Sequence, residues 1–351
     1  MRHILLSLLL LSSSPSWAES NTTTNMQLIY DNPLVDMTYP HVSGEYLVYS
    51  QRVNQGYQVM RLKRSDLYGA AKDVSPQLDK EAVRNGVALS NGDIAYVSNR
   101  LGNLAPWLSQ TNRETAIAVG AFQNLLLPNH LDVSSNGKTW IFDTTYETTR
   151  YARIGNQFSD GFLHTQLIGQ AWRMYHNKFW TIKSSYPASK DGVTNKFLQP
   201  HLFVLKRNSN DLNMLGDGFD ATLNPDGKSM IFVRENNGNF DLWQQNIDGS
   251  ELKQLTRNTF ADIEPSFSAD GKRIAFVSNR DAAGDILQTS IYVLEIATGK
   301  IERITQGSNV TDGGPAWLDD KTIIFHSNRD PKAPNTDTVN NWRLWAVSLP
   351  K

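Results

Sequence analysis

The chain contains no cysteine among its 351 residues. That absence excludes a disulfide framework, a thiolate metal site and a lipid-modified cysteine near the N-terminus. An excess of either charge is missing as well, because 34 Lys and Arg residues stand against 35 Asp and Glu residues. This balance argues against a polyanion as a partner. We therefore expect no nucleic-acid partner.

Long apolar runs are also scarce. The clearest, residues 4–11, is far shorter than the ~20 residues that a membrane-spanning helix needs. It follows Arg2 and precedes a Ser-rich segment ending at Ala18, which is the pattern of a secretory signal peptide over residues 1–18. Residues 19–26 are polar without a pattern and are predicted to be a disordered tail. Residues 27–350 should form one domain, periplasmic or secreted, without membrane insertion.

Recognisable catalytic motifs are missing too. The sequence has no Gly-x-Ser-x-Gly elbow, no phosphate-binding Gly loop and no His-Glu-x-x-His helix. Six histidines lie beyond the signal segment: His41, His130, His164, His176, His201 and His326. Aligned by the repeat described below, they fall at different positions of the blades and are not expected to meet, so no histidine metal site is predicted. Carboxylates around a channel mouth could bind calcium through oxygen ligands, but their spacing matches no dedicated loop. The sequence thus indicates no catalytic residue and no cofactor.

What the sequence does contain is a repeat. Seven short turns, the clearest of the form Asp-Gly-Lys, each precede a run of alternating apolar residues. Their central residues stand at positions 44, 92, 137, 177, 227, 271 and 320, so the spacing is 40 to 50 residues. Short strands repeated at this period are typical of a β-propeller with one four-stranded blade per repeat. We predict an all-β, seven-bladed propeller with antiparallel blades.

One repeat, residues 262–305, shows the four strands most clearly. Residues 265–268 form the expected inner strand, and the turn centred on Gly271 forms a tight hairpin that glycine permits through positive φ. The second strand, residues 273–278, is apolar on both faces, as stacking between neighbouring blades requires. The third and fourth strands follow at residues 290–296 and 301–305.

The two ends of the chain are predicted to close the ring. The last repeat stops after its third strand, at residues 345–350, whereas residues 27–30 precede the first repeat and resemble an outer strand. We predict that residues 27–30 join the last blade as its missing strand. Closure of this kind buries two blade faces and removes an unpaired strand edge.

The clearest copies of the repeat share an extended pattern. From Asp262 to Asp281 it reads Asp-x-x-Pro-x-aromatic-Ser-x-Asp-Gly-Lys-x-Ile-x-Phe-x-Ser-x-Arg-Asp, and residues 312–330 preserve much of it. This pattern resembles the repeat of the TolB-like β-propeller family, a relative of the WD-type repeat. The resemblance is strong in the last third of the chain and faint over residues 120–210. It implies six blades, the alternative to our count of seven, while the additional α/β domain of TolB has no counterpart here.

Strand order assigns the connections to two rims. The hairpins after the first and third strands of each blade lie on one rim of the ring, which we call the tight-turn rim. The connections after the second strand and between blades lie on the opposite rim, which we call the loop-rich rim. Long polar loops at residues 184–200, 278–289 and 327–341 belong to the loop-rich rim, and such loops are often functional. We predict the binding surface there. Its candidate residues are Asp262, Asp312, Arg280, Arg329, Asp281, Asp330, Trp342, Lys190 and Asp191.

Structural roles compete with binding at several of these positions. Asp262 and Asp312 could cap the connections between blades through Asx-type turns. Arg280 and Arg329 recur at one repeat position, which favours a structural hydrogen bond to a neighbouring blade over a ligand contact.

Two classes of function remain. The first is a non-catalytic periplasmic or secreted propeller, a monomer that binds a protein or peptide partner on its loop-rich rim. The TolB-like resemblance implies an envelope lipoprotein near peptidoglycan as that partner, although the missing α/β domain argues against a Tol-system role. The alternative is a carbohydrate-active propeller, an oligosaccharide lyase or hydrolase with a site in the central channel. Such an enzyme would need a general acid and base at the axis.

Overall fold

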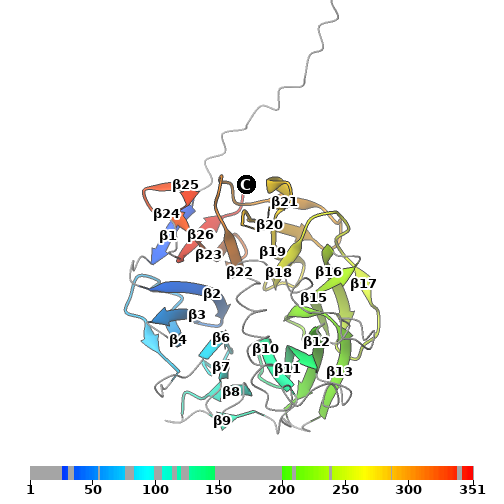
Figure 1. The fold of residues 1–351 in the computed structure, drawn as a ribbon. Helices are drawn as coiled ribbons and strands as arrows, with labels where there is room; N and C mark the ends of the chain where they lie inside the picture. Colours follow the sequence, from blue (N-terminus) through cyan, green and yellow to red (C-terminus); the bar gives the residue numbers. More distant parts are fainter. Residues whose placement is uncertain are drawn as a thin grey trace, which may run out of the picture.

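The fold is a closed ring of β-sheets. The computed structural model describes residues 26–30, 35–53, 56–75, 83–98, 105–112, 117–119, 126–146, 200–207, 211–236, 239–285, 287–337 and 342–350. Within them, six four-stranded antiparallel sheets stand as blades around a central axis (Figure 1). No helix in these residues is long and apolar enough to cross a membrane.

The first five blades take their strands in chain order. Blade 1 contains β2 (Asp36–Ser43), β3 (Tyr46–Val53), β4 (Gly56–Lys63) and β5 (Lys72–Asp73), and blade 2 contains β6 (Val83–Ala88), β7 (Ile94–Ser98), β8 (Ala105–Ser109) and β9 (Ile117–Ala118). Blade 3 contains β10 (Leu126–Val133), β11 (Thr139–Tyr146), β12 (Pro200–Lys206) and β13 (Asp211–Asp217). Blade 4 contains β14 (Phe219–Leu223), β15 (Ser229–Asn236), β16 (Asn239–Asn246) and β17 (Lys253–Gln254).

The last two blades follow the same plan. Blade 5 contains β18 (Asp262–Phe267), β19 (Arg273–Ser278), β20 (Ser290–Glu295) and β21 (Ile301–Arg303), with the short 3-10 turn η4 (Arg280–Ala282) after its second strand. Blade 6 contains β22 (Asp312–Asp319), β23 (Thr322–Ser327), β26 (Arg343–Ser348) and β1 (Met26–Tyr30), and the small hairpin of β24 (Arg329–Asp330) and β25 (Ala333–Asp337) follows β23.

The structure corrects the number of blades from seven to six. Strand β11 pairs directly with β12, from Thr139 opposite Lys206 to Thr145 opposite Pro200. Residues 147–199 are therefore inserted between the second and third strands of one blade. The predicted turn at position 177 falls within this insertion, outside the described residues. Because the insertion is about as long as one repeat, the turn that it contains has the spacing expected of a further blade, and the count from the sequence was one too high.

The predicted closure of the ring is confirmed. Strand β1 pairs antiparallel with β26, with Met26 opposite Val347 and Leu28 opposite Trp345. The strand begins one residue earlier than predicted. Ile29 is 4% exposed and packs in a cluster with residues of blades 1 and 6, so β1 belongs to the core. The predicted signal peptide and the rest of the predicted tail lie outside the described residues.

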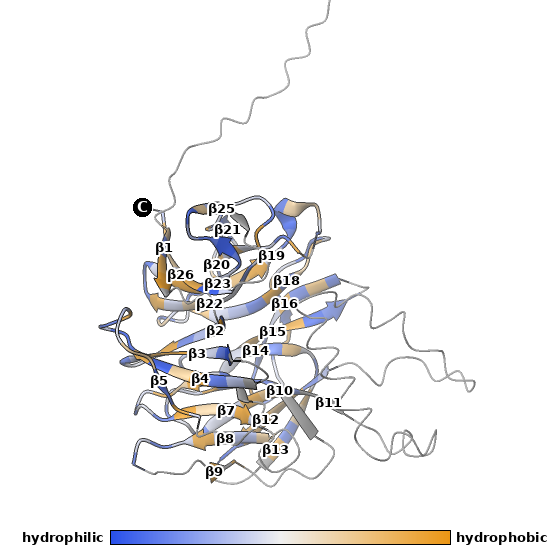
Figure 2. Ribbon diagram, turned by 60° about the vertical axis from the view of Figure 1, so that its left-hand side comes forward, coloured by the Kyte–Doolittle hydropathy of each residue, from blue (hydrophilic) through white to orange (hydrophobic). Residues whose placement is uncertain are grey.

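The core lies between blades, because each second strand is apolar on both faces. In β19, Ile274 and Phe276 pack toward blade 4, whereas Ala275 and Val277 pack toward blade 6. This confirms the two-faced second strand expected from the repeat. The second strand of blade 2, β7, is accordingly largely orange in Figure 2. Each large apolar side chain buried in this way contributes about 1.5–3 kcal/mol, so stacking rather than pairing alone holds the ring together.

The repeated Asp-Gly-Lys turn has a local explanation. Asp226 Oδ1 accepts a hydrogen bond from Lys228 N at 2.8 Å, and Asp270 Oδ1 accepts one from Lys272 N at 3.1 Å. The intervening Gly271 has a φ of +68°, a region that disfavours other residues. An Asx-type turn therefore supplies the hairpin between first and second strands, which accounts for its recurrence without a binding role.

Candidate functional site

Every inner strand carries a β-bulge at the same place along its length. In five of the six, the first residue of the bulge has a positive φ between 50° and 54°: Tyr39, Asn85, Asp220, Glu264 and Gly314. Positive φ is uncommon for residues other than glycine, and bulges commonly redirect side chains near sites of function. The bulges thus form a ring of backbone irregularities around the axis.

Side chains of neighbouring blades hold this ring in place. The N–H of Asn85 donates to Ser50 Oγ at 3.2 Å and that of Asp220 donates to Asp143 Oδ2 at 2.8 Å. The N–H of Gly314 donates to Glu264 Oε2 at 2.6 Å. The N–H of Tyr39 donates to His326 Nδ1 at 3.3 Å. Because the bulge removes each of these amides from the hydrogen-bond ladder of its own blade, a side chain of the preceding blade accepts its hydrogen bond instead.

A cavity of about 450 Å³ lies on the axis, lined by the inner strands of all six blades. Its walls run from the bulges, such as Asn85 and Glu264, to the hairpins that follow, such as Gly44 and Asp320. It therefore occupies the half of the channel nearer the tight-turn rim. Its volume falls within the range of small-molecule sites. The binding surface predicted from the sequence lies on the other rim, the loop-rich one.

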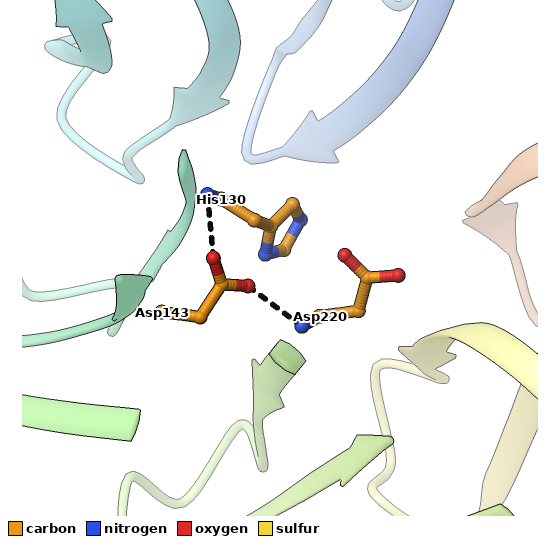
Figure 3. Close-up of side chains that lie close together, drawn as sticks. All are labelled: His130, Asp143 and Asp220. Atoms are coloured by element: carbon orange, nitrogen blue, oxygen red, sulfur yellow. Dashed lines mark hydrogen bonds between the residues drawn. The ribbon is translucent and has the colours of Figure 1, made fainter. Parts of the chain in front are cut away.

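Three polar side chains converge beside this cavity. Candidate ligand atoms of His130, Asp143 and Asp220 all lie within 4.8 Å of one another, and Figure 3 shows the imidazole ring facing the two carboxylates. Asp143 is 1% exposed, and its Oδ1 accepts from His130 N at 3.2 Å. Burial raises the pKa of Asp143 to about 6, while His130 opposes the rise and Asp220 adds to it. His130 Nδ1 is buried without a hydrogen-bond partner among the described residues.

A second histidine and carboxylate meet on the same wall. His41 Nδ1 accepts a hydrogen bond from Ala88 N at 3.2 Å, and His41 Nε2 lies 3.7 Å from Asp132 Oδ1. Asp132 also accepts from Leu223 N at 2.7 Å, so its carboxylate links blades 3 and 4. Burial works to raise the pKa of Asp132, but His41 and the backbone amides outweigh it and the pKa is lowered.

Sequence reasoning missed this convergence. The prediction compared the histidines only with one another, whereas in the structure His130 meets two carboxylates, Asp143 on the second strand of the same blade and Asp220 on the inner strand of the next blade. A signal for the bulges was available in five of the six inner strands, where a Pro or a small residue follows the first bulge residue, as in Asn85-Gly86, Asp220-Ala221 and Glu264-Pro265.

Four of the predicted rim residues form two ion pairs. Arg329 Nη2 lies 2.5 Å from Asp312 Oδ2 with both side chains fully buried, and Arg280 Nη2 lies 2.8 Å from Asp262 Oδ1. Asp262 Oδ2 also accepts from Asn258 Nδ2 at 2.7 Å. These carboxylates and guanidinium groups hold the connections between blades, the structural role weighed above, and the Asp312–Arg329 pair has no surface for a ligand.

The other predicted rim residues are more accessible. Asp281 has 42% of its side chain exposed and pairs with Arg303 at 3.0 Å, and it accepts the hydroxyl of Tyr292. Burial and this carboxylate raise the pKa of Tyr292. Asp330 accepts from Lys332 N at 2.8 Å, and the ring of Trp342 packs edge-on against His326. Lys190 and Asp191 lie outside the described residues.

The loop-rich rim carries a groove between blades 4 and 5. Its volume is about 620 Å³, and its lining comes from the loops after β15 and β19 and from the connection between the two blades. Amide and charged side chains dominate it: Asn236, Asn239, Asp241, Gln254, Arg257, Asn258 and Asn279. Arg257 Nη2 donates to Gln254 Oε1 at 3.1 Å, and Gln254 Nε2 donates to Asp241 Oδ2 at 3.0 Å.

Sequence comparison finds relatives of part of the chain. No protein-family model matches it. It is 28% identical over 97 residues to a "Protein TolB homolog" of Chlorobium chlorochromatii, a match covering 28% of this chain and 20% of the relative. It is 37% identical over 93 residues to "Dipeptidyl-peptidase 5" of Porphyromonas gingivalis, covering 24% of this chain and 12% of the relative. The chain thus spans a fifth or less of the length of these two relatives.

Solved structures match nearly the whole chain at the level of fold. A putative TolB from Agrobacterium tumefaciens aligns with a TM-score of 0.55 at 15% identity, over 93% of this chain and 94% of that one. An oligogalacturonate lyase in complex with manganese aligns with a TM-score of 0.54 at 12% identity, over 95% of both chains. Together with the blade pattern and the sequence relatives, these likenesses support the resemblance to the TolB-like β-propeller family.

Proposed function

We propose that this protein is a non-catalytic propeller, periplasmic or secreted, that binds an extended segment of a protein partner on its loop-rich rim. The observation that carries the proposal is the amide-lined groove between blades 4 and 5. The likeness to proteins named TolB supports the same class of function.

The groove has the chemistry that an extended peptide needs. A peptide presents N–H and C=O groups along its length, and Asn and Gln side chains offer both acceptors and donors to them. Asn258 is already oriented, because its Oδ1 accepts from Phe260 N at 2.6 Å and its Nδ2 donates to Asp262. Such prior ordering lowers the entropic cost of binding. Arg257 is exposed and available to a carboxylate of the partner.

The test begins with a photo-crosslinking residue placed at Asn258 in the full chain, followed by identification of the captured protein from an envelope extract. The purified partner is then titrated calorimetrically against the wild type and against Arg257→Ala, which we expect to weaken binding at least tenfold, as at a central interface residue. Lys272→Ala is the matched control, since Lys272 is an exposed cation on the tight-turn rim. Equal affinity of the wild type and Arg257→Ala would contradict the proposal.

A carbohydrate-active propeller is the second candidate, favoured by one observation. His130 and Asp220 line an axial cavity of about 450 Å³, and Asp143 beside them has a pKa near neutrality, as proton transfer requires. The fold likeness to an oligogalacturonate lyase is compatible with this reading. Incubation with oligogalacturonate and other acidic oligosaccharides, monitored for new unsaturated or reducing ends, distinguishes the two candidates. Product that disappears in His130→Gln would support the enzyme and exclude the non-catalytic proposal.

A further inference from the structure

The side chains of His130, Asp143 and Asp220 come from two blades and meet at one point on the channel wall. His130 lies on β10, Asp143 on β11 and Asp220 on β14. Their candidate ligand atoms, one nitrogen and two carboxylate oxygens, lie within 4.8 Å of one another. Metal–ligand bonds to nitrogen and oxygen are about 2.0–2.2 Å, so an inward movement of about 1 Å would bring all three to coordination distance.

One of the three ligand side chains, that of Asp143, is already oriented by hydrogen bonds. Asp143 Oδ1 accepts from His130 N and Oδ2 accepts from Asp220 N, so both carboxylate oxygens are fixed by backbone amides. Asp220 has a φ of 50° at its bulge and lines the axial cavity. Outer hydrogen bonds that orient ligands in this way are a regular feature of protein metal sites.

The electrostatics of the cluster favour a cation. His130 Nδ1 is buried and has no hydrogen-bond partner among the described residues, although buried polar atoms are ordinarily paired. The charged groups that act on Asp143 are His130 and Asp220, so two carboxylates share one imidazole. A divalent cation would satisfy the nitrogen and offset both carboxylates. This nitrogen atom is the observation that separates the cluster from an ordinary group of acidic residues.

We propose that His130, Asp143 and Asp220 form a site for a divalent first-row transition metal ion, of the class of zinc or manganese. One imidazole nitrogen with two carboxylates suits such ions, whereas calcium takes oxygen ligands almost exclusively. The remaining coordination positions face the axial cavity, where water or an oxygen atom of a ligand can complete them. The site is separate from the groove on the loop-rich rim, so the two proposals fail independently.

Calorimetric titration of the full, chelator-treated protein with zinc chloride, manganese chloride and calcium chloride tests the site. We expect one saturable site for zinc or manganese. His130→Gln and Asp220→Asn should each weaken it at least tenfold, since each removes a ligand while keeping a side chain of similar size. His201→Gln is the matched control and should change affinity less than twofold, because His201 faces a carboxylate, Asp217 at 3.0 Å, on the outer part of blade 3.

A wild type that shows no saturable zinc or manganese binding up to about 1 mM would overturn the proposal, as would unchanged affinity in both ligand variants. Tighter binding of calcium than of either transition metal would overturn the assigned nitrogen ligand. Circular dichroism checks that each variant is folded. If neither variant folds, pulsed electron paramagnetic resonance of the manganese-loaded wild type decides, because a coordinated imidazole produces a nitrogen signal and its absence refutes the site.

Discussion

The buried ion pair of Asp312 and Arg329 is predicted to contribute strongly to the stability of the last blade. Arg329 Nε donates to Asp312 Oδ1 at 2.9 Å and its Nη2 donates to Oδ2 at 2.5 Å. Nη1 donates to the carbonyls of Gln306 and Pro334, both at 2.6 Å. The hydroxyl of Thr305 donates to the same carboxylate at 2.6 Å. One guanidinium thus joins the inner strand, the connection from blade 5 and the hairpin after β23.

Arg329→Met keeps an apolar stem and removes the charge, which leaves the Asp312 carboxylate buried without its cation. Breaking a buried pair from one side costs about 3–5 kcal/mol, and we expect a loss of that size. Arg280→Met is the matched control from blade 5. Its partner Asp262 lies at 2.8 Å, but Arg280 is 21% exposed, so water can replace part of the interaction. We expect about 1–2 kcal/mol there.

Equilibrium unfolding in urea at pH 7, followed by tryptophan fluorescence, measures both variants. The double variant Asp312→Leu with Arg329→Met should recover part of the loss, because an apolar pair can replace a buried ion pair at little cost. Destabilisation of Arg329→Met by less than about 1 kcal/mol, or no more than that of Arg280→Met, would refute the reasoning.

Three further predictions concern the ring, the bulges and the groove. Ile29→Ala should lower the free energy of unfolding by about 2–4 kcal/mol, as at a core position, whereas Leu252→Ala, 45% exposed, should have little effect; equal effects would show that β1 is not part of the core. Gly314→Ala places a Cβ 2.7 Å from His326 Nδ1, while Gly227→Ala meets nothing within 4 Å. Both variants should lose about 1–2 kcal/mol of folding stability because alanine disfavours the left-handed backbone. Thermal unfolding should show a further loss of ~1–3 kcal/mol in Gly314→Ala, whose site is crowded; equal losses in the two variants would contradict the bulge geometry. Burial raises the pKa of Asp241 and Asp262 adds to it, so the folded state binds this proton more tightly and its stabilising contribution is lost as the pH rises through the folded pKa. In the wild type the free energy of unfolding should therefore fall as the pH rises just above the ordinary pKa of aspartate, and in Asp241→Asn this fall should be smaller. Unfolding curves that show the same pH dependence in both proteins would contradict the prediction.

Much of the fold could be predicted from local pattern. The Asp-Gly-Lys turn recurs because its side chain and glycine build a hairpin from a few adjacent residues, and the two-faced second strand follows from apolar residues at consecutive positions. Ring closure by β1 could be inferred because an unpaired last blade leaves an edge exposed. The number of blades could not, since an insertion as long as a repeat has the same spacing as a blade and only the pairing of β11 with β12 separates the two.

The sequence by itself determined the blade, its hairpins and the way the ring closes, because these depend on residues close together in the chain or on the chain ends. Only the tertiary structure decided what faces the axis. His130 and Asp220 are far apart in sequence and differ in repeat position, yet bulges and neighbouring blades bring them beside Asp143. It also showed that Asp312 and Arg329 are buried in a mutual ion pair rather than open to a ligand. Burial and long-range contact are properties of the closed ring, and no single repeat contains them.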